Sequence, residues 1–164
     1  MPDAQVPIRV AATAGDIAQA RALFQEYAAW LAVDLCFQGF AEELATLPGA
    51  YAPPRGLLML AGPEDAAMGC VALRPLTGAG SPSSGMAEIK RLYVGPDARG
   101  TGLGQRLVET VIAGARAIGY WEIKLDTLER MTEARSLYAR LGFRACAPYY
   151  ASPLPGTVYM ELRL

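Results

Sequence analysis

The sequence predicts a single α/β domain whose sheet begins with antiparallel strands and continues with a parallel pair. Two observations support this fold class. Short apolar runs separated by turn residues fill the first half, whereas strand-like and helix-like segments alternate in the second half. The chain has 164 residues, the size of one ordinary domain. Neither an internal repeat nor a linker is visible, so one domain over residues 1–164 is expected.

The first part of the chain is expected to form a strand and two helices. Residues Ile8–Ala12 form an apolar strand candidate that ends in a Thr-Ala-Gly-Asp turn and helix start. From Ile17 to Leu31 the apolar residues recur at helical spacing. A second, short helix is expected over Ala41–Leu47, because a Pro-Gly pair follows it directly.

A β-hairpin is expected next. The apolar run Leu57–Ala61 and the segment Met68–Pro75 flank a Gly-Pro-Glu-Asp turn, which predicts two paired strands. Residues 77–85 consist mostly of Gly, Ser and Pro, and they are expected to form a mobile surface loop.

The second half alternates strands with helices. Strands are expected over Ala87–Val94, Trp121–Leu128 and Tyr159–Leu164, and helices over Gly102–Ile118 and Thr132–Leu141. A glycine directly follows the last helix, as is common at helix C-termini. The order strand, helix, strand favours a parallel pair.

The composition excludes several functional classes. The chain is 52% hydrophobic and 19% charged with a formal net charge of -1, so a nucleic-acid partner is not expected. It contains no histidine, which excludes Ser-His-Asp and Cys-His catalysis and histidine zinc sites. Cys36, Cys70 and Cys146 are widely separated. They are expected to be small apolar packing residues rather than ligands, so no metal is expected.

Neither the N-terminus nor the apolar runs carry a targeting or membrane signal. Residues Met1–Gln5 lack a basic region followed by an apolar one, so no signal peptide is expected. No apolar run reaches the ~18 residues that span a bilayer. The sequence therefore predicts a cytoplasmic protein without a membrane partner.

A glycine-rich loop, Arg99-Gly100-Thr101-Gly102-Leu103-Gly104, joins a predicted strand to a predicted helix. Its glycines leave the backbone amides open, and the helix start adds unpaired N–H groups and the positive end of its dipole. The loop therefore fits a phosphate, although the same glycines also suit a tight turn with close helix–sheet packing. No lysine follows as in a P-loop, and the spacing is not the Gly-x-Gly-x-x-Gly of dinucleotide sites.

The loop resembles the Arg/Gln-x-x-Gly-x-Gly/Ala motif of the GNAT superfamily of N-acetyltransferases. Before the loop, Glu88–Val94 resembles the strand that the family places there. After it, Ala134–Phe143 resembles the family's Ala-x-x-Leu-Tyr-x-x-x-Gly-Phe helix ending. The resemblance implies a GNAT-like mixed sheet of roughly six to seven strands with about four helices and a splayed parallel pair at its centre.

The resemblance also implies acetyl-CoA as the acyl donor. Its pyrophosphate would lie on the amides from Arg99 to Gln105. Its pantetheine would lie beside Leu92, Tyr93 and Val94, where splayed strands leave backbone groups unpaired. Many family members have an asparagine where this chain has Met131. Any contact of that asparagine with pantetheine is then missing or supplied by another residue.

Two residues are candidates for the acid–base chemistry of acyl transfer, in which an amine loses a proton and a thiolate gains one. In the resembling family the tyrosine that corresponds to Tyr138 protonates the thiolate; packing of its helix on the sheet is the alternative role. Glu88, a carboxylate in a central strand, is the candidate base. Its alternative is a structural ion pair with Lys90 or with an arginine.

The acceptor site is less defined. Asp126 and Thr127 either line it or simply end their strand, and Tyr149 and Tyr150 either cover it or pack on a helix. In this fold the segments 28–51 and 147–157 are expected to frame the acceptor groove. Their aromatic and acidic residues form either a rim for a cationic amine or ordinary helix packing with a solvated face: Trp30, Phe37, Phe40, Tyr51, Tyr149, Tyr150, Asp34, Glu42 and Glu43.

The expected function is transfer of an acetyl group from acetyl-CoA to a primary amine by direct attack, with a small molecule or a peptide as acceptor. Two alternatives stay open. One is a non-catalytic acyl-CoA-binding or regulatory module, and the other is an unrelated α/β protein that binds a different phosphate ligand. The acceptor, the acyl-chain preference and a homodimeric state do not follow from the sequence.

Overall fold

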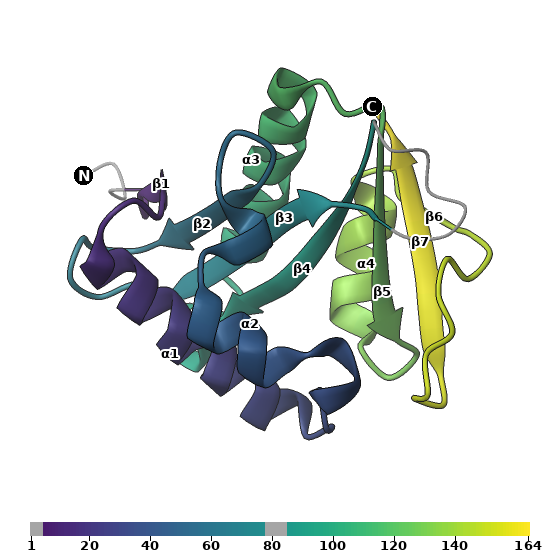
Figure 1. Ribbon diagram of the computed structural model, residues 1–164, viewed down its shortest axis with the longest axis horizontal. Helices are drawn as coiled ribbons and strands as arrows, with labels where there is room; N and C mark the ends of the chain where they lie inside the picture. The colour runs from purple at the N-terminus through teal and green to yellow at the C-terminus, as the bar shows by residue number, and fades with distance from the viewer. Residues whose placement is uncertain (1–4, 78–84) are drawn as a thin grey trace.

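The computed structural model describes residues 5–77 and 85–164, which form one mixed sheet with helices packed on it (Figure 1). The strands are β1 (Ile8–Val10), β2 (Leu57–Ala61), β3 (Gly69–Pro75), β4 (Met86–Val94), β5 (Glu122–Leu128), β6 (Arg144–Ala145) and β7 (Thr157–Arg163). The α-helices are α1 (Ala14–Leu31), α2 (Phe40–Thr46), α3 (Leu103–Ile118) and α4 (Thr132–Arg140). Short 3-10 turns cover Cys36–Gln38, Gly49–Tyr51 and Pro96–Ala98.

The seven-stranded sheet has the order β1-β2-β3-β4-β5-β7-β6. Its β4–β5 pair is parallel, and the other neighbouring strands are antiparallel. This arrangement confirms the predicted fold class, with antiparallel strands first and a parallel pair at the centre. The predicted hairpin is also confirmed, because β2 pairs with β3.

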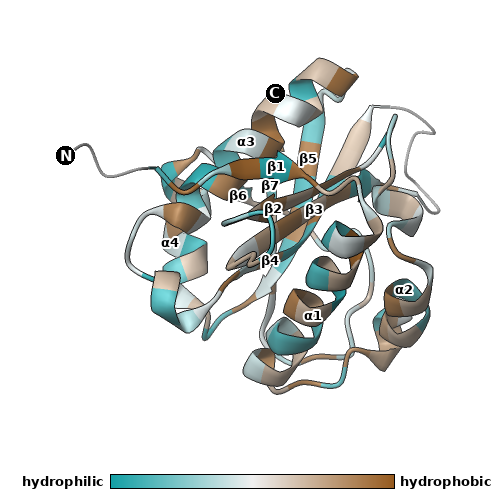
Figure 2. Ribbon diagram, turned by 90° about the vertical axis from the view of Figure 1, so that its left-hand side faces the viewer, coloured by the Kyte–Doolittle hydropathy of each residue, from teal (hydrophilic) through white to brown (hydrophobic). Residues whose placement is uncertain are grey.

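Helices cover both faces of the sheet: α1 and α2 lie on one face, and α3 and α4 lie on the other (Figure 2). Side chains of a strand alternate between the two faces. On β3, Val71 and Leu73 belong to the core under α3, whereas Cys70 and Ala72 belong to the core under α1. A strand buried on both faces is apolar throughout, which explains the continuous apolar runs in the sequence.

A capping box fixes the start of α1. The Asp16 N–H donates to Thr13 Oγ1 at 3.0 Å, and the Asp16 carboxylate accepts from the Thr13 N–H at 3.1 Å. Backbone N–H groups of Ala12 and Thr13 favour the charged carboxylate and lower the pKa of Asp16 to about 2. The Thr-Ala-Gly-Asp segment, predicted as a turn and helix start, forms the N-terminus of α1, which begins at Ala14.

Several sequence predictions differ from the structure in detail. β1 ends at Val10 rather than Ala12, and the two-residue strand β6 was not predicted. Cys36 is exposed, so its predicted role as a buried packing residue is wrong, whereas Cys70 is buried as expected. The predicted mobile loop at residues 77–85 lies, apart from its two end residues, outside the described residues. Among the helices described, none is long and apolar enough to cross a membrane.

β4 and β5 separate after a short ladder. They pair over three residues each, Met86–Glu88 with Glu122–Lys124. Beyond this point β5 stays paired with β7, while β4 continues to Val94 and has no β5 partner in the described ladder. Figure 1 shows the two strands diverging toward the lower end of the molecule. This divergence opens the sheet at its centre.

A β-bulge in β4 lies at the opening. Ala72 of β3 faces Lys90 and Cys70 faces Tyr93, so Arg91 and Leu92 together oppose one β3 residue. Arg91 has a φ of 62°, which is uncommon for a residue other than glycine. The bulge re-aims the side chains that follow it along β4.

Candidate functional site

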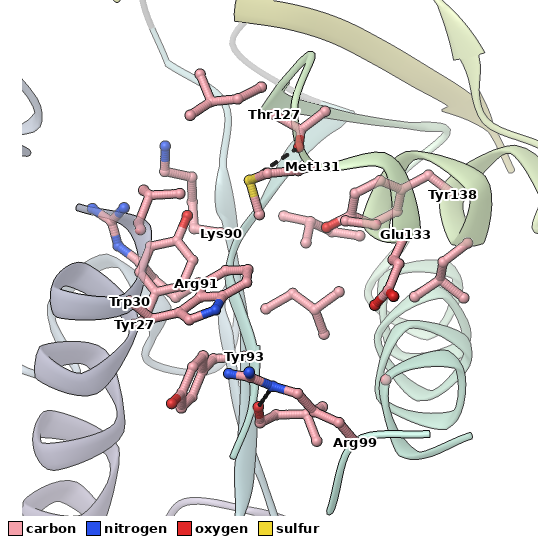
Figure 3. Close-up of a pocket in the computed structure, with 18 of the residues that line it drawn as sticks. Tyr27, Trp30, Lys90, Arg91, Tyr93, Arg99, Thr127, Met131, Glu133 and Tyr138 are labelled. Atoms are coloured by element: carbon pink, nitrogen blue, oxygen red, sulfur yellow. Dashed lines mark hydrogen bonds between the residues drawn. The ribbon is translucent and has the colours of Figure 1, made fainter. Parts of the chain in front are cut away.

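A cavity of about 580 Å³ occupies the opening between β4 and β5. Its wall includes Leu103 and Leu137 from the core under α3 and α4, and Tyr27 and Leu31 from α1 on the opposite face. Figure 3 shows Tyr27 and Trp30 on one side of this space and Tyr138 of α4 on the other. Two molecules that enter from opposite faces of the sheet can therefore meet inside the cavity.

The glycine loop forms one end of the cavity. Gly100 and Gly102 have φ values of 78° and 81°, in the left-handed region, and a Cβ at either position would meet nothing within 4 Å. Within the described residues, no hydrogen bond is donated by the backbone N–H groups of residues 100–105. These amides and the start of α3 form a suitable site for an anion.

Most of the predicted cofactor residues line this cavity: Leu92, Tyr93, Val94, Arg99, Gly100, Gly102, Leu103, Gly104 and Gln105. Thr101 does not line it, because its hydroxyl turns back and donates to the Ala98 carbonyl at 2.6 Å. The backbone of the loop therefore faces the cavity, whereas the Thr101 side chain does not.

Arg99 connects the loop to α1. Its guanidinium lies 5.1 Å from the ring centre of Trp30 and 5.6 Å from that of Tyr93, and its Nε donates to the Val94 carbonyl at 3.0 Å. Arginine stacks well on aromatic faces. This stacking holds a positive charge beside the open amides (Figure 3).

Tyr138 projects from α4 into the cavity and is 6% exposed. Its ring packs on Phe143 with a centroid distance of 5.6 Å. Burial raises the pKa of the Tyr138 phenol, and the nearby phenol of Tyr27 and carboxylate of Asp126 raise it further. At neutral pH the phenol therefore keeps its proton and can donate it.

Glu88 lies buried on the α1/α2 face of β4, with 2% exposure. It forms an ion pair with Arg74 at 2.8 Å and accepts from the Tyr149 hydroxyl at 2.5 Å. Its partner is therefore an arginine and not Lys90. Burial and the Glu88 charge raise the pKa of Tyr149, which makes Tyr149 a donor. Glu88 is not among the residues that line the cavity.

Lys90 and Asp126 form an ion pair in the cavity wall. The Lys90 Nζ lies 3.3 Å from Asp126 Oδ1, and Asp126 Oδ2 accepts from the Tyr150 hydroxyl at 2.7 Å. Asp126 thus belongs to the site rather than simply ending its strand. Neither Tyr149 nor Tyr150 lines the cavity; each instead binds a carboxylate on the sheet.

Two further wall residues are Thr127 of β5 and Met131 of the β5–α4 turn. The Thr127 hydroxyl donates weakly to the Met131 sulfur at 3.7 Å (Figure 3). The thioether of Met131 thus occupies the position of the family asparagine and turns toward Thr127. An amide donor is missing at this point of the wall.

The expected aromatic and acidic rim forms only in part. Trp30 lines the cavity, whereas Phe37, Phe40 and Tyr51 do not. Among the acids, Glu43 instead binds Arg91 Nε and Nη2 at 2.9 and 3.0 Å. Within residues 5–77 and 85–164, no three His, Cys, Asp or Glu side chains gather in a way that could hold a metal ion.

Arg91, Leu128 and Arg130 line the wall without having been predicted from the sequence. The segments expected to frame the acceptor groove do contribute to the wall, through residues that the sequence did not single out: Leu31, Leu35, Gln38 and Leu154. The adjacent cations Lys90 and Arg91 in a central strand were the one visible signal, since charged residues are rarely buried without a partner. The leucines carry no such signal, because they are indistinguishable from core residues in the sequence.

Comparison with known proteins agrees with this geometry. Residues 19–143 match the model of the acetyltransferase (GNAT) family. The chain is 40% identical over 150 residues to an uncharacterized N-acetyltransferase of Schizosaccharomyces pombe, covering 91% of this chain and 89% of that protein.

Solved structures share the fold. An acetyltransferase from Streptococcus agalactiae superposes with a TM-score of 0.77 at 22% identity, covering 98% of this chain and 99% of that one. A GNAT family acetyltransferase from Elizabethkingia anophelis with acetyl-CoA bound has a TM-score of 0.54 at 24% identity, covering 66% of this chain and 76% of that one. The family match and the fungal relative together show that this chain belongs to the GNAT acetyltransferase family.

Proposed function

We propose that residues 1–164 form a single domain that transfers an acetyl group from acetyl-CoA to a primary amine by direct attack. The cavity that crosses the sheet carries this proposal, because it joins the open amide loop to Tyr138 and to the opposite face. The acetyl-CoA bound to the Elizabethkingia anophelis neighbour supports this choice of donor.

The chain offers a binding surface for each part of the donor. The amides from Gly100 to Gln105, with Arg99 beside them, bind the pyrophosphate. The β4 edge at Leu92, Tyr93 and Val94 hydrogen-bonds pantetheine in place of the missing β5 partner. The amine enters from the α1/α2 face.

Two residues manage the protons in the proposed reaction. The amine nitrogen bonds to the acetyl carbon and the carbon–sulfur bond breaks. Tyr138 then gives its proton to the leaving thiolate and recovers one from solvent. Glu88 is the proposed base. Because neither Glu88 nor its partner Tyr149 lines the cavity, the amine proton reaches Glu88 through a water path.

Acetyl-CoA binding is the first test. At a hundredfold excess over its dissociation constant, acetyl-CoA should stabilise the folded protein by about 2.7 kcal/mol. For a chain of this size that corresponds to a rise in Tm of roughly 5–11 °C in a thermal melt. An unchanged Tm would contradict the donor site.

Turnover is the second test and separates an enzyme from a binding module. Free thiol should appear when acetyl-CoA and an accepted primary amine are both present, and not with either alone. A panel of amino acids, polyamines, arylalkylamines and peptides covers the acceptor classes. Stabilisation by acetyl-CoA without thiol release from any amine would favour the non-catalytic module.

A further inference from the structure

We propose that the acceptor is an α-amino acid with an apolar side chain, and that Lys90 and Asp126 recognise its carboxylate and its amino group. The proposal rests on the proposed acetyl transfer and names the substrate class of the same site. Three observations carry it: an incompletely bonded ion pair, the charge balance around it, and an apolar cluster beside it.

The Lys90–Asp126 pair is buried but incompletely bonded. The side chains are 5% and 14% exposed. The Lys90 ammonium has three donors, and within the described residues it gives one hydrogen bond, to Asp126 at 3.3 Å. A desolvated ammonium with unused donors is costly unless another acceptor reaches it. Lys90 lines the cavity, so a ligand carboxylate there would complete its hydrogen bonds.

The charge around this pair favours an anionic group. On the acceptor side the wall contains three cations, Lys90, Arg91 and Arg130, and one carboxylate, Asp126. Glu43 neutralises Arg91, and Asp126 neutralises Lys90. Arg130 donates to the Leu31 carbonyl and has no carboxylate partner among the ion pairs of the described residues. Counted over these wall residues and Glu43, the surplus is one positive charge on the exposed Arg130, which favours a carboxylate over a polyamine.

An apolar cluster adjoins the pair. Leu31, Leu35 and Leu128 form a small core between the end of α1 and the end of β5. Met131 and Leu154 pack against it, and all five side chains also line the cavity. Such a wall suits an apolar side chain of the acceptor, because contact with it removes apolar surface from water.

The arrangement also directs the amine toward the proposed acid. A zwitterion beside the pair would place its carboxylate at Lys90 and its amino group at Asp126. Asp126 and Tyr138 both line the cavity, so an amino group held at Asp126 would share this space with the Tyr138 phenol. In Figure 3 Lys90 lies on the α1 side of the cavity, away from Tyr138.

The test compares leucine with leucinamide, which has nearly the same shape but no carboxylate. We expect kcat/KM for leucine to exceed that for leucinamide by about tenfold or more, as for loss of one charge-assisted hydrogen bond. Leucinamide has the less basic amine and therefore more free amine at neutral pH, so amine availability works against this result. Glycine and spermidine should be poorer acceptors than leucine. A leucinamide or spermidine rate equal to or above that of leucine would overturn the proposal.

Variants of Lys90 test whether its ammonium causes the preference for leucine over leucinamide. In Lys90→Met the preference for leucine over leucinamide should collapse to within about twofold, while Lys90→Arg should retain most of it. Lys124→Met is the matched control, because Lys124 lies on the neighbouring strand, binds Glu122 and Glu161, and does not line the cavity. A preserved preference in Lys90→Met would overturn the role of Lys90. Stabilisation of each variant by acetyl-CoA shows that it is folded.

A binding measurement separates this proposal from the proposed function. Leucine should raise the Tm of the CoA-saturated protein more than leucinamide does, without any chemistry. If acetyl-CoA neither binds nor releases thiol, the proposed function fails. If acetyl-CoA reacts with other amines while leucine neither reacts nor binds, the substrate class is wrong and the function stands.

Discussion

At the scale of single residues, Tyr138 has the surroundings that best match its proposed role. The phenol is buried and lines the cavity, and its raised pKa keeps it protonated at neutral pH. We expect Tyr138→Phe to lower kcat by about 10²–10⁴-fold, the usual contribution of a positioned acid. Thiol release at saturating acetyl-CoA measures this loss, and the affinity for acetyl-CoA should change little.

Tyr120→Phe is the matched control for that experiment. Tyr120 is 4% exposed, and its hydroxyl donates to the Arg55 carbonyl at 2.7 Å, away from the cavity. Loss of the Tyr120 hydroxyl should leave kcat unchanged. A similar fall in kcat in both variants would indicate general packing damage, and an unchanged kcat in Tyr138→Phe would contradict the acid role.

Glu88 is the residue whose role needs a comparison of turnover with stability, because its arginine partner also fits a purely structural part. If Glu88 is the base, Glu88→Gln should lower kcat/KM by about 10²–10⁴-fold in a protein that still binds acetyl-CoA. A structural role would lower Tm and leave kcat/KM of the folded protein largely intact. Glu122→Gln is the control. Glu122 lies on β5, next to β4, is 4% exposed and forms an ion pair with Lys124 of the same strand at 3.0 Å.

At the scale of elements, the β-bulge organises the site. Glu88 and Lys90 lie two residues apart and share the α1/α2 face of β4. Without the bulge, Arg91 would point to the opposite face. With it, Arg91 also reaches the α1/α2 face, where it binds Glu43 and lies 5.8 Å from the Tyr27 ring centre. Leu92 and Val94 then face α3. The bulge therefore places cations on the acceptor side and apolar residues on the donor side.

The order of elements could be predicted because its signals are local. Apolar periodicity and the Gly or Pro stops mark β2, β3, α3 and α4 within a few residues of their observed ends. The start of α1 could be predicted as well, although a capping box and a turn use the same residue types. Strand β6 and the bulge depend on pairing with distant strands, so no local pattern shows them.

At the scale of the whole molecule, the donor side of the site could be predicted from the sequence more completely than the acceptor side. The donor side comes from one contiguous stretch, the β4–loop–α3 segment, together with the α4 motif around Tyr138. The acceptor side combines residues that are far apart along the chain, such as Leu31, Leu128 and Leu154. Only the folded sheet brings these leucines together, and the Lys90–Asp126 pair with them.

Acetyl-CoA binding should slow amide exchange on the β4 side of the opening, since the proposed donor site lies there. In hydrogen–deuterium exchange we expect protection of the amides of residues 100–105 and 92–94, whose backbone groups lie at the open loop and the unpaired strand edge. Amides in the fully paired β2–β3 ladder should not change. Protection confined to residues 100–105 would instead indicate a different phosphate ligand without a pantetheine arm.

Glycine variants complete the exchange experiment. Gly102→Val should abolish this protection, because a branched side chain at a φ of 81° is strained and would cover the open amides. Gly119→Val is the matched control: Gly119 ends the same helix with a φ of 106° and open space around it, and does not line the cavity. It carries a comparable backbone strain, so its protection by acetyl-CoA should persist. Loss of protection in both variants would mean that strain in α3 alone prevents binding, and retained protection in Gly102→Val would contradict the pyrophosphate site.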